Sequence, residues 1–231
     1  MLIIKDIKFQ LFLTLLLVFF VLYPNPLKLG LSIYRIFHPP VHPEEAVHIF
    51  PIDVSQENLT PSELEALVIE NIPYQYDWTT YGMPWYFPTV EEVIENQTGD
   101  CKSRMIVLAS IFEYMDQPYD IRYSLDHFWV DYPGKVATGI EREEVALYSR
   151  EEGFQIPDVQ WESTLNAYSA FWDYMPTDVK LAFYIAMFLP AFLVRISFER
   201  WLQFKKFRLL IFHNSPFRCL KIFTELNCKE P

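Results

Sequence analysis

Two uncharged apolar runs divide this chain and limit what it can fold into. The first, residues 9–23, reads FQLFLTLLLVFFVLY, and the second, residues 181–194, reads LAFYIAMFLPAFLV. A helix rises about 1.5 Å per residue and a membrane core is about 30 Å thick, so each run is a marginal span that its flanks can extend. The alternatives are a cleaved signal sequence and a buried core helix. We favour two membrane helices, the first uncleaved, because no pair of small residues follows the first run.

The flanks of both runs predict an orientation. Lys5 and Lys8 precede the first run, and five basic residues lie between positions 195 and 208, just after the second. By the positive-inside rule, we expect both termini in the cytoplasm and a two-pass membrane protein. Aromatic residues suited to a headgroup interface stand just before the second run. They are Tyr168, Phe171, Trp172 and Tyr174.

Acidic and basic residues are also separated along the chain by the second apolar run. Residues 24–178 contain eight Lys or Arg against twenty-six Asp or Glu, whereas residues 195–231 contain eight basic and three acidic residues. This contrast predicts an acidic extracytoplasmic domain, periplasmic or extracellular, and argues against nucleic acid as a partner. The expected parts are an anchor at 1–27, a Pro-rich extracytoplasmic connector at 28–60, a folded domain at 61–165, an aromatic interfacial segment with the second membrane helix at 166–196, and a basic cytoplasmic tail at 197–231.

Two capping boxes mark helix starts in the central domain. In TPSE, Thr60 is followed three residues later by Glu63, and in TVEE, Thr89 is followed by Glu92. In such a pair the hydroxyl and the carboxylate satisfy each other's free backbone N–H groups. The predicted helices run from 61 to about 70 and from 90 to about 96.

The second half of the domain changes from helix to strand. After Cys101, apolar residues recur every three or four positions, which predicts an amphipathic helix that ends before Pro118. Three short β-prone runs follow, YDIRYSL, HFWVDY and VATGI, and the last two flank PGK as in an antiparallel hairpin. This order of elements predicts an α+β fold class.

Cys101 is the first candidate for chemistry. It follows Gly99 and Asp100 at a predicted helix start, where free N–H groups and the helix dipole favour a thiolate. The expected topology also separates it from Cys219 and Cys228, so no intramolecular disulfide can form. The alternative is a small packing residue, but position 101 precedes the apolar stripe of its helix.

A nucleophilic thiol needs a base, and His127 is the only histidine between Cys101 and the second apolar run. Asp131 shares its strand face but lies about 13 Å along the strand. If PGK is a three-residue loop, Glu141 stands opposite His127; a two-residue loop would place Ile140 there instead. The carboxylate behind the base therefore depends on the hairpin register.

Residues 89–123 followed by HFWVDY resemble the transglutaminase-like core of the papain superfamily, over roughly residues 62–145. The matching positions are Gly99, Asp100, Cys101, Ala109, His127, Trp129 and Val130. The resemblance implies a helix bearing the cysteine packed on a small antiparallel sheet, here flanked by two membrane helices. It also implies Cys101 as nucleophile and His127 as base and then acid.

The resemblance carries further expectations for the site. A carboxylate on the strand after His127 is implied; the family usually has Asp, and here Glu141 would substitute. The Cys101 N–H would help to stabilise an oxyanion. Trp85 is a candidate second donor, and Asp100 and Trp129 are further cleft candidates.

These expectations define two functions. One is a membrane-anchored cysteine acyltransferase or peptidase that acts on a protein or peptide and needs no cofactor. The other is a catalytically silent domain that binds a peptide or assembles a membrane complex through the aromatic stretch 74–87. No metal is expected, because HPEEAVH, with His42, Glu44, Glu45 and His48, is typical of a solvated connector.

Overall fold

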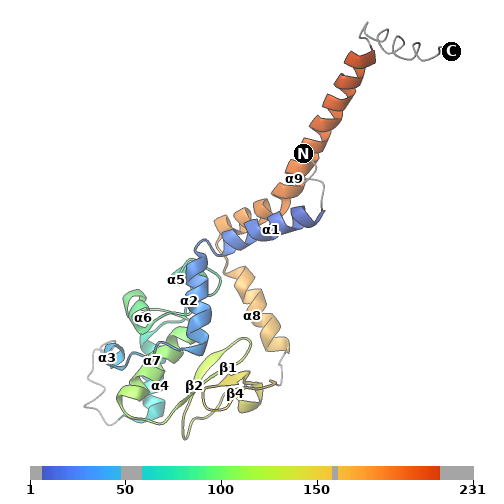
Figure 1. Cartoon of the computed structure of the whole chain (residues 1–231). Coiled ribbons are helices and arrows are strands. Elements are labelled where there is room, and N and C mark those ends of the chain that lie inside the picture. The colour runs from blue at the N-terminus through green and yellow to red at the C-terminus, as the bar shows by residue number, and fades with distance from the viewer. Residues whose placement is uncertain (1–6, 48–58, 158–160, 214–231) are drawn as a thin grey trace, which may run out of the picture. The chain divides into compact units, whose positions relative to one another are not determined.

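A computed structural model describes residues 7–47, 59–157 and 161–213 (Figure 1). It divides into a central unit, Phe19–Phe183, and a second unit that combines the chain up to Val18 with the chain from Tyr184 onward. The helices are α1 Ile7–Leu22, α2 Pro26–Phe37, α3 Pro43–Ala46, α4 Pro61–Asn71, α5 Asp77–Thr80, α6 Val90–Asn96, α7 Cys101–Tyr114, α8 Trp161–Asp173 and α9 Thr177–His213, with a short 3-10 helix at Glu143–Val145. The strands are β1 Asp120–Tyr123, β2 Phe128–Asp131, β3 Tyr148–Ser149 and β4 Gly153–Phe154.

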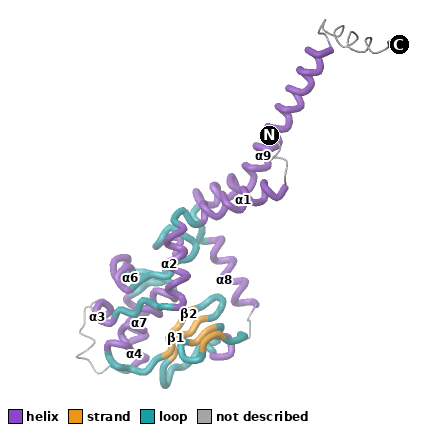
Figure 2. The backbone as a smooth tube through the Cα atoms, in the orientation of Figure 1, coloured by secondary structure: helices purple, strands orange, loops and turns teal. Residues whose placement is uncertain are grey.

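The central unit is an α+β domain, as predicted. Its strands form one antiparallel sheet in the order β2-β1-β3-β4, drawn in orange in Figure 2. Helix α7 packs against β2 and also contacts α3, α4 and α6. The main core lies between this helix layer and the sheet, where Phe112, Ile121 and Val130 are buried.

Helix α7 differs from the amphipathic helix that the sequence predicts. From Lys102 to Phe112 every side chain except that of Arg104 is buried. Because other helices and the sheet surround it, α7 is the central helix of the domain rather than a surface helix with one apolar face. Its first residue, Cys101, is therefore fixed by the most extensively packed element of the molecule.

Both predicted capping boxes are confirmed. Thr60 and Glu63 cap α4, and Thr89 and Glu92 cap α6; in each pair both reciprocal hydrogen bonds are present. The helices end within a residue or so of the expected positions, because the signals that set their starts are local.

The segment 28–60 is not the extended connector that its prolines suggest. Residues from Pro26 to Phe37 form α2, and Pro43 begins the short α3; residues 48–58 lie outside the described residues. Helix α2 belongs to the central unit. Ser32 Oγ accepts the Phe87 N–H at 3.1 Å, and Arg35 pairs with Glu92 at 3.1 Å.

The predicted hairpin between HFWVDY and VATGI is wrong. Strand β2 pairs with β1, with Phe128 opposite Tyr123 and Asp131 opposite Asp120. Residues 136–140 form no strand, and the sheet is completed by β3 and β4. The YDIRY strand and the HFWVDY strand are both confirmed, and they pair with each other.

Among the described residues, one helix is clearly long and apolar enough to cross a membrane: the 20 residues Thr177–Ile196 within α9, whose most apolar stretch has a mean hydropathy of 1.8. Pro190 lies inside it without ending it. Helix α1 has 16 residues and meets the same criterion only when joined to α2 across a 76° bend. The expectation of two flanking membrane helices is therefore corrected to one clear candidate.

Candidate functional site

A cavity of about 110 Å³ brings the three predicted triad residues together. Cys101, His127 and Glu141 all line it, although they come from the start of α7, the residue before β2 and a loop. The other lining residues are Glu65, Val68, Ile69, Tyr74, Arg104, Met105, Leu108, Phe128, Trp129 and Val130. The three residues that the sequence proposes as a triad therefore line one cavity.

Asp100 fixes the helix start that carries the thiol. It is the N-cap of α7, and its carboxylate accepts the backbone N–H groups of Lys102 and Ser103. Neither of these two hydrogen bonds uses the Cys101 N–H. This N–H stands at a helix N-terminus, where backbone donors can stabilise an anion.

Gly99 permits a close approach between the cavity wall and α7. A Cβ at this position would lie 2.2 Å from Ser103 Oγ and 2.3 Å from Ser103 Cβ. The segment around Gly99 also forms a parallel bridge with Tyr74, and the Gln75 N–H donates to the Gly99 carbonyl at 3.0 Å. A side chain at position 99 would therefore clash with Ser103 on α7.

The Cys101 thiol is protonated at neutral pH, contrary to the expectation from its helix position. Burial raises its pKa to about 12, and the Asp100 and Asp77 carboxylates add to the rise. The Lys102 ammonium and the backbone N–H of Phe128 oppose it. Desolvation and two negative neighbours outweigh the dipole of α7, so the resting site holds a neutral thiol rather than a thiolate.

The backbone N–H of Phe128 donates a hydrogen bond to the Cys101 sulfur. Phe128 directly follows His127 in the chain. His127 Nε2 lies 3.4 Å from Glu141 Oε1, which leaves Nδ1 on the other side of the ring. The ring also stacks on Trp129, with centroids 5.8 Å apart and planes 12° from parallel. Within the described parts of the chain, no hydrogen bond joins the imidazole to the Cys101 sulfur.

Glu141 lies beside His127, but contacts within a loop position it there rather than the predicted hairpin. Its carboxylate accepts the Thr138 hydroxyl at 2.9 Å and lies 3.4 Å from Lys135 Nζ. Burial opposes ionisation, but the His127 hydrogen bond, the Lys135 charge and the Thr138 hydroxyl together lower the pKa of Glu141 to about 2. The carboxylate is therefore charged at neutral pH and can orient the imidazole.

The other carboxylate candidate is occupied elsewhere. Asp131 lies at the far end of β2 from His127 and pairs with Arg122 at 3.3 Å. It does not line the cavity. Among the described residues, Glu141 is the carboxylate that the structure brings to His127.

Two of the cleft candidates occupy different environments. Trp129 lines the cavity and is buried, and its Nε1 has no hydrogen-bond partner among the described residues. Trp85 packs against the core, and its ring centre lies 5.8 Å from Lys102 Nζ. Because Trp85 is not a lining residue of the cavity, the structure does not place it as an oxyanion donor.

A buried ion cluster beside Cys101 was not predicted from the sequence. Lys102 Nζ contacts Asp100 Oδ2 and lies 3.0 Å from Asp77 Oδ2, and all three side chains are buried. Burial alone would lower the pKa of Lys102, but the Asp100 and Asp77 charges raise it above its usual value. No local pattern marks such a residue, because a lysine in the first turn of a helix is usually exposed.

The aromatic stretch 74–87 is divided between core and surface. Trp78, Tyr86 and Phe87 are at most 4% exposed, whereas Tyr74 is 50% exposed and stands at the cavity. Asp77 Oδ2 accepts the Tyr86 N–H at 2.7 Å, which fixes this loop against the ion cluster. Part of the stretch therefore supports the site from behind, and Tyr74 stands at its surface.

Comparisons with known proteins do not assign this chain to a family. A scan against protein-family models finds no match, and a search of curated proteins finds no match. The transglutaminase-like resemblance stays a hypothesis that depends on the motif and on the geometry of the Cys101 cavity.

Proposed function

We propose that the central domain is a cysteine acyl-transfer enzyme of the transglutaminase-like type. The observation that supports this most directly is the shared cavity of Cys101, His127 and Glu141, in which Glu141 contacts the ring nitrogen His127 Nε2. This order of nucleophile, base and orienting carboxylate is the arrangement that activates a thiol.

In the proposed reaction, the carbonyl carbon of an amide substrate binds beside Cys101. His127 Nδ1 removes the thiol proton as the sulfur attacks, and the C–S bond forms. The Cys101 N–H stabilises the oxyanion. When the intermediate collapses, the C–N bond breaks and His127 donates its proton to the leaving amine. Water or a second amine then attacks the thioester and restores the thiol.

The raised pKa of Cys101 selects one form of this mechanism. With a thiol pKa near 12, no preformed thiolate–imidazolium pair exists at neutral pH, so the proton moves during attack. Glu141 stays ionised and stabilises the imidazolium that forms. The rate is then controlled by the protonation state of the imidazole.

Helix α9 supports a membrane anchor for this enzyme. Thr177–Ile196 follows the domain directly and is apolar enough to span. We propose that this helix holds the domain at an extracytoplasmic surface, with α1 as a second span and both termini in the cytoplasm. A reporter fused after Pro231 should be found in the cytoplasm; an external reporter would exclude this topology.

The test is to trap the acyl-enzyme. The purified chain is treated with p-nitrophenyl acetate, and peptides are analysed by mass spectrometry before and after neutral hydroxylamine. We expect acetyl on Cys101 that hydroxylamine removes, and no acetyl at this position in the variant His127→Asn. Equal acetylation of Cys101 in the chain with and without His127 would exclude activation by this base.

A second function is favoured by one observation. No hydrogen bond joins Cys101 to His127 among the described residues, and the resting thiol is protonated. A catalytically silent domain that binds a peptide at this cavity would share these features. In that case p-nitrophenyl acetate would leave Cys101 unmodified in every variant.

A further inference from the structure

Three potential metal ligands meet away from the Cys101 cavity. One ligand atom each from His42, Glu45 and Glu91 lies within 4.8 Å of the other two. His42 Nδ1 already contacts Glu91 Oε1. We propose that these side chains form a binding site for one zinc ion.

The fold places the three ligands by independent means. His42 is the N-cap residue of α3, and Glu45 follows three residues later, so both stand on one helical turn. Glu91 lies in the first turn of α6, which the Thr89 capping box fixes. The backbone N–H of His42 donates to Ser110 Oγ, on buried α7, at 3.0 Å.

The donor set suits zinc. One imidazole nitrogen and two carboxylate oxygens give three protein ligands, and water can take the fourth tetrahedral position. Magnesium and calcium prefer a shell of oxygens only, so the imidazole disfavours them. In the bound state, zinc would replace the direct contact between His42 and Glu91, and each side chain would need only a small rotation.

The charge balance also favours a dication. A neutral His42 with ionised Glu45 and Glu91 has two negative charges, which Zn²⁺ would neutralise. Arg35, which precedes this segment, pairs with Glu92. A simple His42–Glu91 ion pair would leave Glu45 without a role.

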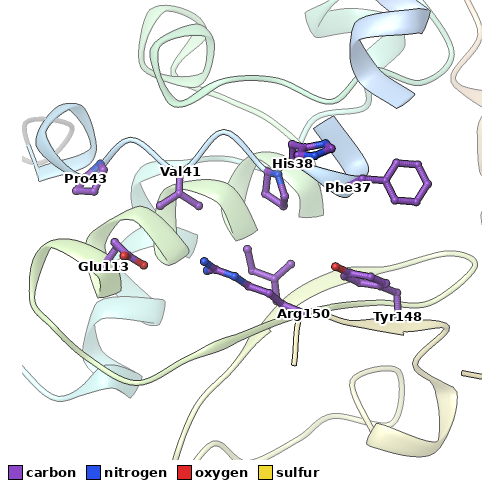
Figure 3. Close-up of a pocket in the computed structure, with 9 residues that line it drawn as sticks. Phe37, His38, Val41, Pro43, Glu113, Tyr148 and Arg150 are labelled. Carbon is purple, nitrogen blue, oxygen red and sulfur yellow. The ribbon is translucent and has the colours of Figure 1, made fainter. Parts of the chain in front are cut away.

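A bound ion would fix the wall of a second cavity. The segment that contains His42 also supplies Phe37, His38, Val41 and Pro43 to a cavity of about 380 Å³. In Figure 3 these residues face Glu113, Tyr148 and Arg150 across the opening. Zinc would join this wall to α6, and neither the cavity nor the ion takes part in the chemistry at Cys101.

The experiment uses the full chain in detergent after removal of metals by a chelator. Zinc is added in equilibrium dialysis, and thermal unfolding is followed in parallel. We expect one more equivalent of bound zinc in the wild type than in Glu45→Gln, and a zinc-dependent rise in Tm that this variant lacks. Comparison between variants removes any contribution from the cysteines, which all chains share.

Matched variants make the result specific. Glu44→Gln, on the same short helix but outside the cluster, should keep the extra equivalent, and His42→Gln should lower the zinc affinity by at least about tenfold. Glu45 is exposed, so Glu45→Gln should fold even if His42→Gln does not.

Two results would overturn the proposal. One is equal zinc stoichiometry and equal Tm shift in the wild type and in Glu45→Gln. The other is a loss of stability in His42→Gln that is the same with and without zinc, which would show an ion pair only.

Discussion

The two sides of the Cys101 cavity are built in different ways. Cys101 begins α7, which is buried on almost every side and is joined to the rest of the domain by the ion cluster at Lys102. His127 precedes β2, which is an edge strand of the described sheet, and Glu141 lies in the loop after β2, which forms no strand itself. The thiol is positioned by packing, whereas the base is positioned by a few polar contacts.

Because of this difference, substitutions on the thiol side and on the base side should affect different properties of the protein. Substitutions on the thiol side remove packing or leave charges buried, so they should first lower the free energy of unfolding. Substitutions on the base side remove polar contacts that water can partly replace, so they should first lower the reactivity of the thiol.

Lys102→Met should have the largest effect. It leaves the Asp77 and Asp100 carboxylates buried without their cation, which should cost about 3–5 kcal/mol of unfolding free energy in a denaturant titration. Arg142→Met, on the exposed loop of the base side, is the control and should cost less than about 0.5 kcal/mol. Similar losses in the two variants would contradict the comparison.

Gly99→Ala should have an intermediate effect. The new methyl group would lie within 2.3 Å of Ser103 side-chain atoms, so Ser103 or the backbone at position 99 must shift, at about 1–3 kcal/mol. Gly139→Ala is the matched control, because nothing lies within 4 Å of a Cβ at that position. The same denaturant titration measures both, and a stable Gly99→Ala would show that the thiol side is less tightly packed than we describe.

Glu141→Gln should have a smaller, pH-dependent effect on stability. Because folding lowers the pKa of Glu141 to about 2, its charge stabilises the folded state above the ordinary carboxylate range, and this contribution is lost as the pH falls toward 2. The variant should cost about 1 kcal/mol at pH 7 and nothing near pH 2. A cost that does not change with pH would exclude the charged contacts with His127 and Lys135.

The helical half of the fold could be predicted because its signals are local. Thr60 and Thr89 each satisfy backbone groups within their own first turn, so no distant residue has to be known. The strands in YDIRY and HFWVDY could also be predicted, but their pairing could not, because VATGI is β-prone although the partner of β2 is β1, and pairing is decided by the sheet as a whole.

The candidate site was predicted in part for the wrong reason. Glu141 was expected through a hairpin register, and it reaches His127 instead because the chain turns back after Tyr132 and is held by Thr138 and Lys135. The thiolate at Cys101 was expected from helix position alone. Burial raises the pKa of the thiol and so reverses that expectation. The residues that bury the thiol come in part from a distant loop, and the local sequence does not reveal them.

His127→Asn should change stability least and reactivity most, and it gives the most direct test of base activation. The measurement is the rate of Cys101 alkylation by iodoacetamide from pH 5 to 10, read by mass spectrometry, with glutathione as reference. With His127 acting as base, Cys101 of the wild type should be alkylated faster than Cys101 of His127→Asn at pH values well below the raised thiol pKa. If both chains show only the late rise expected of the raised thiol pKa, His127 does not activate Cys101.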